Sequence, residues 1–385
     1  MKPASLKHLV ITTIVVSAAC AGAGAKAGAY KQTDLVSNIP GLAPVTDPSL
    51  VNPWGVSFFA GSPFWVSNQG TSTSTLYAVT GTTAAKLGLT VGIPPGGSPF
   101  LGPTGQVANT NPLSFPVGNG GNGGPAHFIF ANLNGTISAW DTPMTPSSFI
   151  QVTTPGASYT GLAINHTDTE LFAANDAAGA IDVFNSAFAQ ISLGLGAFAT
   201  PASFGTLVPF NVQDIGGNVF VTYAPPGHPA QTTAALGEGA VAEFTEGGVL
   251  EKTLDGGQLA APWGVTFAPS GWGPFGGDLL VGNFSYDHSE INAFNPTTWA
   301  FEGSIGINPG LGDTAGGLWA LDFGGMGNNG SPNILYFTDG LNGETAGLFG
   351  AFSVPEPSTW AMMLVGLGGL GLAAGRRRRP PRAIG

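Results

Sequence analysis

Short apolar runs separated by glycine, proline and asparagine recur along the chain from residue 30 to residue 353. The clearest unit reads WGVTFA, DLLVGN, INAFN and FEGSIG between residues 263 and 306. Runs rich in β-branched and aromatic residues and bounded by turn residues predict β-strands, and no helical period separates these runs. A second unit at residues 210–254 reads FNVQDI, NVFVTY, AVAEFT and VLEKTL. The pattern therefore predicts units of four strands.

Two signatures repeat between these units. NPWGVSF at residues 52–58 returns as APWGVTF at 261–267, and an apolar strand that ends in Asn or a substitute occurs six times. The ends of these strands, called the anchor positions below, are Asn68, Asn132, Asn175, Tyr223, Asn283 and Asp339. Six units of four locally connected strands predict an all-β fold, a six-bladed β-propeller.

The last unit lacks a strand. Residues 317–323, 333–339 and 347–353 supply only three, whereas the strand-like run YKQTDLVS near residue 30 belongs to no complete unit. An open blade would expose unpaired backbone groups along its edge, which folded proteins avoid. We therefore expect residues 31–37 to pair with 347–353 as the outer strand of the sixth blade.

The charge of the region from 30 to 353 limits the kinds of molecule that it can bind. The region from 30 to 353 contains three lysines, no arginine and twenty-one acidic residues, a net charge of −18. Such a surface repels nucleic acid and lacks the guanidinium that phosphate recognition commonly uses. The composition excludes a nucleic-acid partner and leaves neutral ligands and divalent cations.

The anchor positions are candidate ligands for a cation. Asn68, Asn132, Asn175, Asn283 and Asp339 occupy the same place in five units and should form one ring around the axis. Side-chain amides with one carboxylate suit Ca²⁺, which takes six to eight oxygen ligands. Asn and Asp also shape strand-ending turns through their own backbone, and we favour this interpretation. The sequence leaves open whether any metal is bound.

Other catalytic signals are weak. No GxSxG nucleophile elbow occurs, and no two histidines stand at metal-ligand spacing. A formal GxGxxG at residues 118–123 lacks the strand-to-helix context of a nucleotide site. Trp54, Trp263 and Trp319 recur in the first strands, where packing is favoured over sugar stacking. Enzymatic activity is therefore undecided, and a noncatalytic role is favoured.

The first residues have the pattern of a secretory signal peptide. Lys2 and Lys7 precede an apolar run from residue 9 to 20, and small residues follow with plausible cleavage after Ala27 or Ala29. Cys20 is the only cysteine of the chain. Cleavage after Ala27 or Ala29 removes it, so the mature protein would have neither a reactive thiol nor a disulfide. Export by the secretion machinery is the expectation.

The last residues combine Pro-Glu-Pro, an uncharged apolar stretch and an arginine cluster. Residues 358–375 are long enough for a membrane helix, and the arginines would stay on the cytoplasmic side. The order of the three parts resembles the PEP-CTERM signal of Gram-negative bacteria, which the membrane protease exosortase cleaves. The residues that carry this resemblance are Pro355, Glu356, Pro357, Arg376, Arg377, Arg378 and Arg379.

The body resembles a family of uncharacterised secreted bacterial propellers that carry this tail. The resemblance rests on stretches such as DPSLVNPWGVSF (47–58), PFNVQDIGG (209–217) and LYFTDGLNGE (335–344). It implies a propeller fold and a location outside the cytoplasm, but it implies no activity. The expected organisation is a signal peptide (1–29), a six-bladed β-propeller (30–353), a sorting signal with a transmembrane helix (354–379) and a cytoplasmic tail (380–385).

These expectations lead to one favoured function and one alternative. The favoured function is noncatalytic binding or scaffolding at the cell envelope or in an exopolysaccharide matrix, with exosortase and polysaccharide as partners. The protein would be anchored transiently in the inner membrane and then reach the cell surface or the medium. The alternative is a calcium-dependent hydrolase or lactonase with its site in the central channel.

Overall fold

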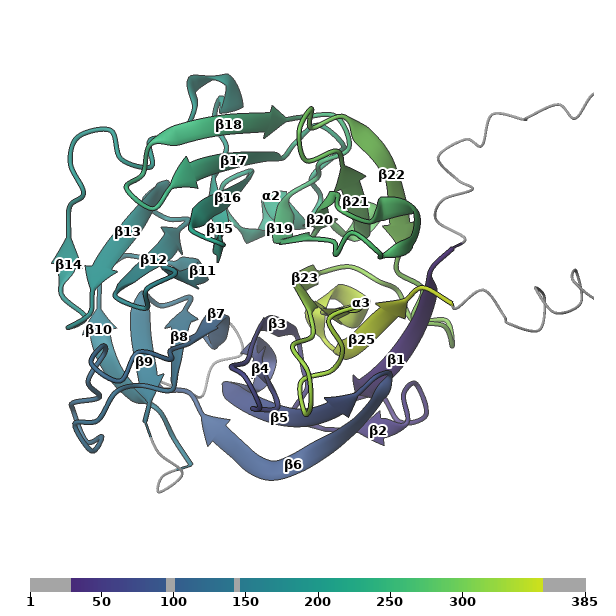
Figure 1. Cartoon of the computed structure of the whole chain (residues 1–385), viewed down its shortest axis with the longest axis horizontal. Helices are drawn as coiled ribbons and strands as arrows, with labels where there is room; N and C mark the ends of the chain where they lie inside the picture. The colour runs from purple at the N-terminus through teal and green to yellow at the C-terminus, as the bar shows by residue number, and fades with distance from the viewer. Residues whose placement is uncertain (1–28, 95–100, 142–145, 356–385) are drawn as a thin grey trace, which may run out of the picture.

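The chain forms a ring of six β-sheets around a central axis, as the computed structural model in Figure 1 shows. The structure describes residues 29–94, 101–141 and 146–355. Each sheet is one blade, and its strands pair antiparallel except at the outer edge of the sixth blade. The first strand of each repeated unit lies closest to the axis. The predicted six-bladed propeller is confirmed.

The first three blades are each built from four consecutive strands. Blade one contains β3 (Pro53–Ser57), β4 (Phe64–Asn68), β5 (Thr73–Thr80) and β6 (Thr83–Gly92). Blade two contains β7 (Pro103–Ala108), β8 (Phe128–Asn132), β9 (Thr136–Trp140) and β10 (Phe149–Thr153). Blade three contains β11 (Tyr159–Ile164), β12 (Glu170–Asn175), β13 (Ala180–Asn185) and β14 (Gln190–Ile191).

The next two blades repeat this order, and the sixth closes the ring. Blade four contains β15 (Val208–Ile215), β16 (Asn218–Ala224), β17 (Ala240–Thr245) and β18 (Leu250–Asp255). Blade five contains β19 (Pro262–Phe267), β20 (Leu279–Asn283), β21 (Glu290–Phe294) and β22 (Phe301–Gly306). Blade six contains β23 (Leu318–Phe323), β24 (Ile334–Asp339), β25 (Leu348–Ser353), β1 (Lys31–Ser37) and β2 (Val45–Thr46).

The ring closes at the seam that the sequence predicts. Strand β1 pairs antiparallel with β25, from Lys31 opposite Ser353 to Ser37 opposite Leu348. Ser37 Oγ adds a hydrogen bond of 2.7 Å to the carbonyl of Gly347. A short strand not foreseen from the sequence, β2, extends the same sheet by pairing parallel to β1.

The hydrophobic core consists of layers between neighbouring blades. Strand β4 illustrates the pattern, because Phe64 and Val66 pack towards blade six whereas Trp65 packs towards blade two. Both faces of such a strand are buried, which explains why the sequence shows continuous apolar runs rather than strict alternation. The fold is therefore held by six interfaces of similar construction around the ring.

The innermost strands approach one another closely around the axis. A Cβ at Gly105 would lie 2.3 Å from the backbone nitrogen of Leu162, and one at Gly264 would lie 2.3 Å from the carbonyl of Trp319. Only glycine permits this approach, which explains the glycine that follows tryptophan in the repeated PWG motif.

Helical structure is limited to short turns in the described residues. They are α2 (His228–Thr232), α3 (Leu341–Glu344), η1 (Gln69–Thr71), η2 (Ala202–Phe204), η3 (Gly273–Phe275) and η4 (Tyr286–His288). None of the described helices has the length and apolar character needed to cross a membrane. The predicted sorting helix lies outside the described residues.

Candidate ligand-binding cavity

A cavity of about 670 Å³ opens on the face of the ring where the first strand of each blade begins. We call it the Glu344 cavity. Its walls come from segments just before the first strands and just after the second strands, and every blade contributes. Figure 1 shows α2 and α3, which carry two of these segments, close to the centre of the ring. The volume falls in the range of small-molecule sites, about 300–1,000 Å³.

The carboxylate of Glu344 has three hydrogen-bonding partners from three other blades. Its Oε1 accepts a hydrogen bond of 2.8 Å from Asn52 Nδ2, and its Oε2 accepts one of 2.7 Å from the hydroxyl of Tyr286. His228 Nε2 lies 2.5 Å from the same Oε2. Blades one, five and four thus each hold one side of a carboxylate that blade six supplies.

The backbone that presents Glu344 is strained. Asn342, Gly343 and Glu344 all have positive φ, at 55°, 64° and 64°. A residue other than glycine in this region costs of order 1–3 kcal/mol and persists only where its surroundings enforce it. The surroundings of Glu344 therefore hold its backbone in a conformation that is unfavourable by itself. Such strain is common at functional sites.

The long loop between β16 and β17 covers part of the cavity and carries α2. His228 at its start reaches Glu344, and Gln231 Nε2 donates a hydrogen bond of 2.9 Å to Asp176 Oδ1 in blade three. Ser285 Oγ in blade five donates one of 2.7 Å to the carbonyl of Ala234. The loop is thus attached to three other blades while the imidazole of His228 stays half-exposed at the rim.

The ionisable groups of the cavity are perturbed. The hydrogen bond to Glu344 raises the pKa of His228 above its usual value. Burial raises the pKa of Asp176, and burial together with the negative charge of Glu344 raises that of Tyr286. Burial also raises the pKa of Asp339 to about 7, and the negative charge of Glu344 acts in the same direction. The cavity contains no lysine or arginine, so its electrostatic character is neutral to negative.

Polar side chains of Asn52 and Gln69 complete the wall near blade one. Asn52 Nδ2 donates to Gln69 Oε1 at 3.0 Å, and Asn52 Oδ1 accepts from Trp319 Nε1 at 2.9 Å. Asn52 also has a positive φ of 45°. This residue therefore joins the carboxylate of Glu344 to the aromatic floor of the cavity, to which Trp54 contributes.

Of the residues that line this cavity, the sequence singled out Trp54, for which it favoured a packing role. A signal was nevertheless present, since several of them stand within five positions after an anchor. Gln69 follows Asn68, and Glu344 stands five residues after Asp339. Because the second strands all end at the same side of a propeller, residues just after them converge on one face.

The five candidate ligands at the anchor positions lie where the repeat predicts, at the end of the second strand in five blades. Each is paired with the first residue of strand one, next to a register shift, as in Pro53 opposite Asn68 and Pro262 opposite Asn283. In blade four the equivalent Tyr223 also lies next to a register shift, but it pairs with Pro209, the second residue of β15, and β16 continues to Ala224. The repeat thus marks a bulge that recurs in all six sheets.

Much of the hydrogen bonding of these candidates stays within their own blade. Asn68 Nδ2 donates to the hydroxyls of Thr73 and Thr75, and Asn132 Nδ2 donates to the hydroxyl of Thr136. The Oδ1 atoms of Asn68 and Asn132 are buried without a hydrogen-bond donor in the described structure.

The other three candidates also use their polar atoms in strand-end turns. Asn175 Oδ1 accepts from the backbone of Ser158 and Ala178. Asn283 Oδ1 accepts from the backbone of Ala260, and Asp339 Oδ1 accepts from that of Gly316. Among the described residues, no group of three or more His, Cys, Asp or Glu side chains is placed to hold a metal ion.

The opposite end of the axis contains a smaller cavity of about 200 Å³, called here the channel cavity. It is lined by the ends of the innermost strands, including Asp214 in β15 and Asp322 in β23. Burial raises the pKa of Asp322 to about 7 and that of Asp214 to about 6. Two carboxyl groups that resist ionisation therefore face this cavity.

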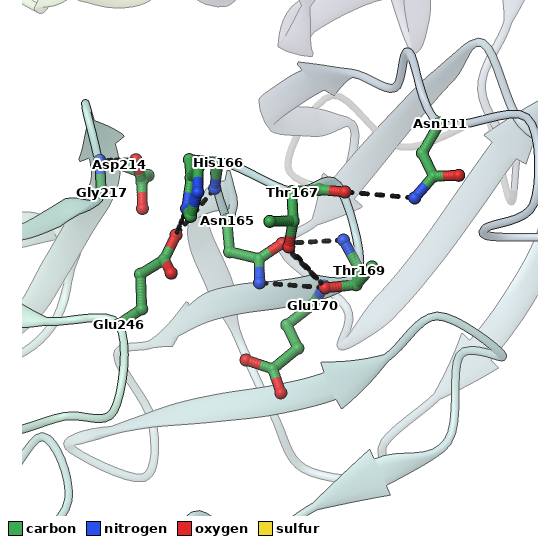
Figure 2. A network of polar contacts seen from close by, with 9 residues as sticks. All are labelled: Asn111, Asn165, His166, Thr167, Thr169, Glu170, Asp214, Gly217 and Glu246. Carbon is green, nitrogen blue, oxygen red and sulfur yellow. Dashed lines mark hydrogen bonds and ion pairs between the residues drawn. The ribbon is translucent and has the colours of Figure 1, made fainter.

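Loops on this second face are joined by the network in Figure 2. Glu246 Oε1 accepts hydrogen bonds from the backbone nitrogen and the ring of His166, at 2.7 and 2.9 Å. Burial alone would raise the pKa of Glu246, but hydrogen bonds from His166 and Asp214 lower it. Asn111 Nδ2 donates to the carbonyl of Thr167. The network ties blades two, three and four together.

Comparison with known proteins identifies relatives of this chain. It is 31% identical over 286 residues to the uncharacterized protein R648 of Acanthamoeba polyphaga mimivirus, covering 69% of this chain and 67% of R648. The chain belongs to the R648 family. Uncharacterized protein L690 of the same virus is 29% identical over 282 residues, covering 69% of this chain and 71% of L690. Uncharacterized protein R640 is 28% identical over 274 residues, 68% of this chain and 48% of R640.

The end of this R648-family chain carries a second identification. Residues 353–379 match the model of the PEP-CTERM protein-sorting motif, which confirms the resemblance noted from the sequence. The motif is the signal that exosortase recognises, so the protein is exported and sorted to the cell surface. Pro355 is described and exposed, whereas Glu356, Pro357 and the arginines at 376–379 lie outside the described residues.

Kuenenia stuttgartiensis hydrazine synthase aligns with a TM-score of 0.47 and 12% identity, over 78% of this chain and 76% of that one.

Proposed function

We propose that this exported propeller binds a neutral, hydroxyl-rich ligand in the Glu344 cavity, without catalysis, as part of the cell envelope or an exopolysaccharide matrix. The observation that carries the proposal is the carboxylate of Glu344, held on a strained backbone by Asn52, Tyr286 and His228. Such a carboxylate accepts hydrogen bonds from the hydroxyls of a sugar.

The lining of the cavity supports a saccharide. Ser158, Thr160, Gln69 and Gln231 add neutral hydrogen-bonding groups, while Val51 and Leu133 offer apolar contacts. Sites of this kind orient a ligand with a few polar groups among apolar ones. The net charge of −18 between residues 30 and 353 and the lack of arginine there disfavour anionic polymers.

The C-terminal sorting motif supports a role outside the cytoplasm. We further propose the division into a signal peptide (1–29), a propeller (30–353), a sorting signal (354–379) and a cytoplasmic tail (380–385). In this scheme the protein is held transiently in the inner membrane until exosortase releases it. The sorting motif at 353–379 supports this order of events.

A glycan array probed with the exported protein from its native host tests the binding proposal. Glu344→Gln keeps the shape of the side chain but removes the negative charge, and we expect its affinity for the bound glycans to fall at least tenfold. Glu251→Gln, on the exposed outer strand β18, is the matched control and should bind as the wild type does. Equal binding by Glu344→Gln, or the release of cleaved sugar products, would contradict the proposal.

A further inference from the structure

Aromatic rings close the axis of the propeller below the Glu344 cavity. Trp54, Phe210, Trp263 and Trp319 come from the innermost strands of blades one, four, five and six, and they form one buried cluster with Phe284. Trp54 and Trp319 stack with ring centroids 3.4 Å apart, and Trp263 meets both edge-on at 6.1 and 5.7 Å. We call this cluster the aromatic plug.

The aromatic plug is fixed by polar contacts as well as by packing. Trp263 Nε1 donates a hydrogen bond of 2.9 Å across the axis to the carbonyl of Thr160 in blade three. Trp319 Nε1 donates to Asn52 in blade one. Trp54, Trp263 and Trp319 are each at most 4% exposed. Removing any ring from this arrangement would break interfaces between blades, so the plug is a permanent part of the fold.

The aromatic plug separates the two cavities of the axis. Trp54 lines the Glu344 cavity from below, whereas Trp263 lines the channel cavity on the other side. The walls of the Glu344 cavity come from all six blades, from Leu133 in blade two to Thr345 in blade six. All six blades line the cavity and the aromatic plug closes its base, so the cavity is a well that is closed at one end.

A polymer can pass along an open groove or through a channel with two openings, but a well admits only an end or a branch. We propose that the Glu344 cavity recognises the terminal residues of a saccharide chain rather than its interior. This inference rests on the proposed function and specifies the part of the polymer that is bound. The carboxylates of Glu344 and Asp176 would accept hydrogen bonds from the hydroxyls that only a chain end presents together.

The inference is tested with the neutral polysaccharide fraction isolated from the matrix of the producing cells. The fraction is divided, and one part is shortened by limited mild acid cleavage, which creates chain ends without changing the total mass. Saturation binding of the full-length exported protein is then measured per milligram of polysaccharide. If the ends are recognised, a tenfold increase in chain ends should raise the number of binding sites about tenfold.

The outcomes separate this inference from the proposed function. A number of sites per milligram that stays constant or falls on shortening, with Glu344→Gln still defective, would overturn end recognition and leave saccharide binding intact. No binding to either fraction would overturn both. Glu251→Gln should follow the wild type in every arm, which shows that any loss at Glu344 arises in the cavity.

Discussion

The indole rings of Trp54 and Trp319 stack with their centroids 3.4 Å apart, although one belongs to the first blade and the other to the last. Each is the second residue of its innermost strand. The contact joins the two sides of the closing seam at the axis, and the hydrogen bond from Trp319 to Asn52 extends it to Glu344. Ring closure and the proposed binding site thus share side chains.

Trp319→Phe tests this coupling. The phenyl ring preserves much of the packing but removes the N–H that Asn52 Oδ1 accepts. A buried acceptor left without its donor costs about 1–3 kcal/mol, so the free energy of unfolding should fall by that amount. Glycan binding should weaken as well, because Asn52 orients Glu344. Stability is measured by denaturant unfolding and affinity by saturation binding. An unchanged affinity would show that Trp319 does not contribute to the binding site.

The seam strand should stabilise the whole ring. Leu35 and Val36 of β1 are at most 1% exposed and pack where blade six meets blade one. Leu35→Ala should lower the free energy of unfolding by about 2–5 kcal/mol in a single cooperative transition. Leu113→Ala is the control, because its side chain is 91% exposed. Truncation to begin at Asp47 should lower the melting temperature further, and an unchanged value would show that the ring closes without β1.

Stability should fall as the pH rises from about 5 to 8. Burial raises the pKa of Asp322 to about 7 from its ordinary 3.8, so the folded protein holds this proton more tightly than the unfolded chain. The resulting stabilisation is complete below the unfolded pKa and is lost as the pH rises through the folded one. His228, whose pKa Glu344 raises, acts in the same direction.

Asp322→Asn isolates the contribution of this carboxyl group. The amide cannot ionise, so melting temperatures measured at pH 5 and at pH 8 should differ less for this variant than for the wild type. Asp255→Asn, at an exposed site on β18, should retain the wild-type difference. Identical pH profiles for Asp322→Asn and the wild type would assign the pH dependence to other groups.

The calcium hypothesis has a direct test. A ligand that binds only the native state raises the melting temperature. Because Asn175 and Asn283 already accept backbone hydrogen bonds in their own blades, we expect millimolar Ca²⁺ to leave the melting curve unchanged. A rise in the melting temperature that disappears in Asp339→Ala would instead support a cation at the anchor positions.

Processing at the sorting motif can be read from the mass of the protein. We expect chains from the native host to lack the arginines at 376–379, because the motif at 353–379 is an exosortase signal. Intact-mass measurement decides this. Mature chains that still end at Gly385 would point to an uncleaved anchor.

The sequence was sufficient for the fold because each blade repeats the same local information. Apolar runs bounded by turn residues fixed the strands, and the missing strand of blade six left one partner for residues 31–37. The Glu344 cavity was harder to foresee. Asn52 lies in a connection between strands, and His228 and Glu344 lie in the short helices α2 and α3. Their spacing from the anchor positions predicts the face of the ring on which they lie, but their mutual contacts depend on how the blades place these connections.

The antiparallel pairing of β1 with β25 also sets how the ring responds to tension. Lys31 lies opposite Ser353, so the two ends of the propeller leave its rim at the same point. A pull that separates these ends loads the inter-strand hydrogen bonds one after another, starting at that pair, instead of all at once. The closed ring is therefore least resistant to a force that pulls its two termini apart. Attachment to a surface through one terminus alone puts no such force across the hydrogen bonds between β1 and β25.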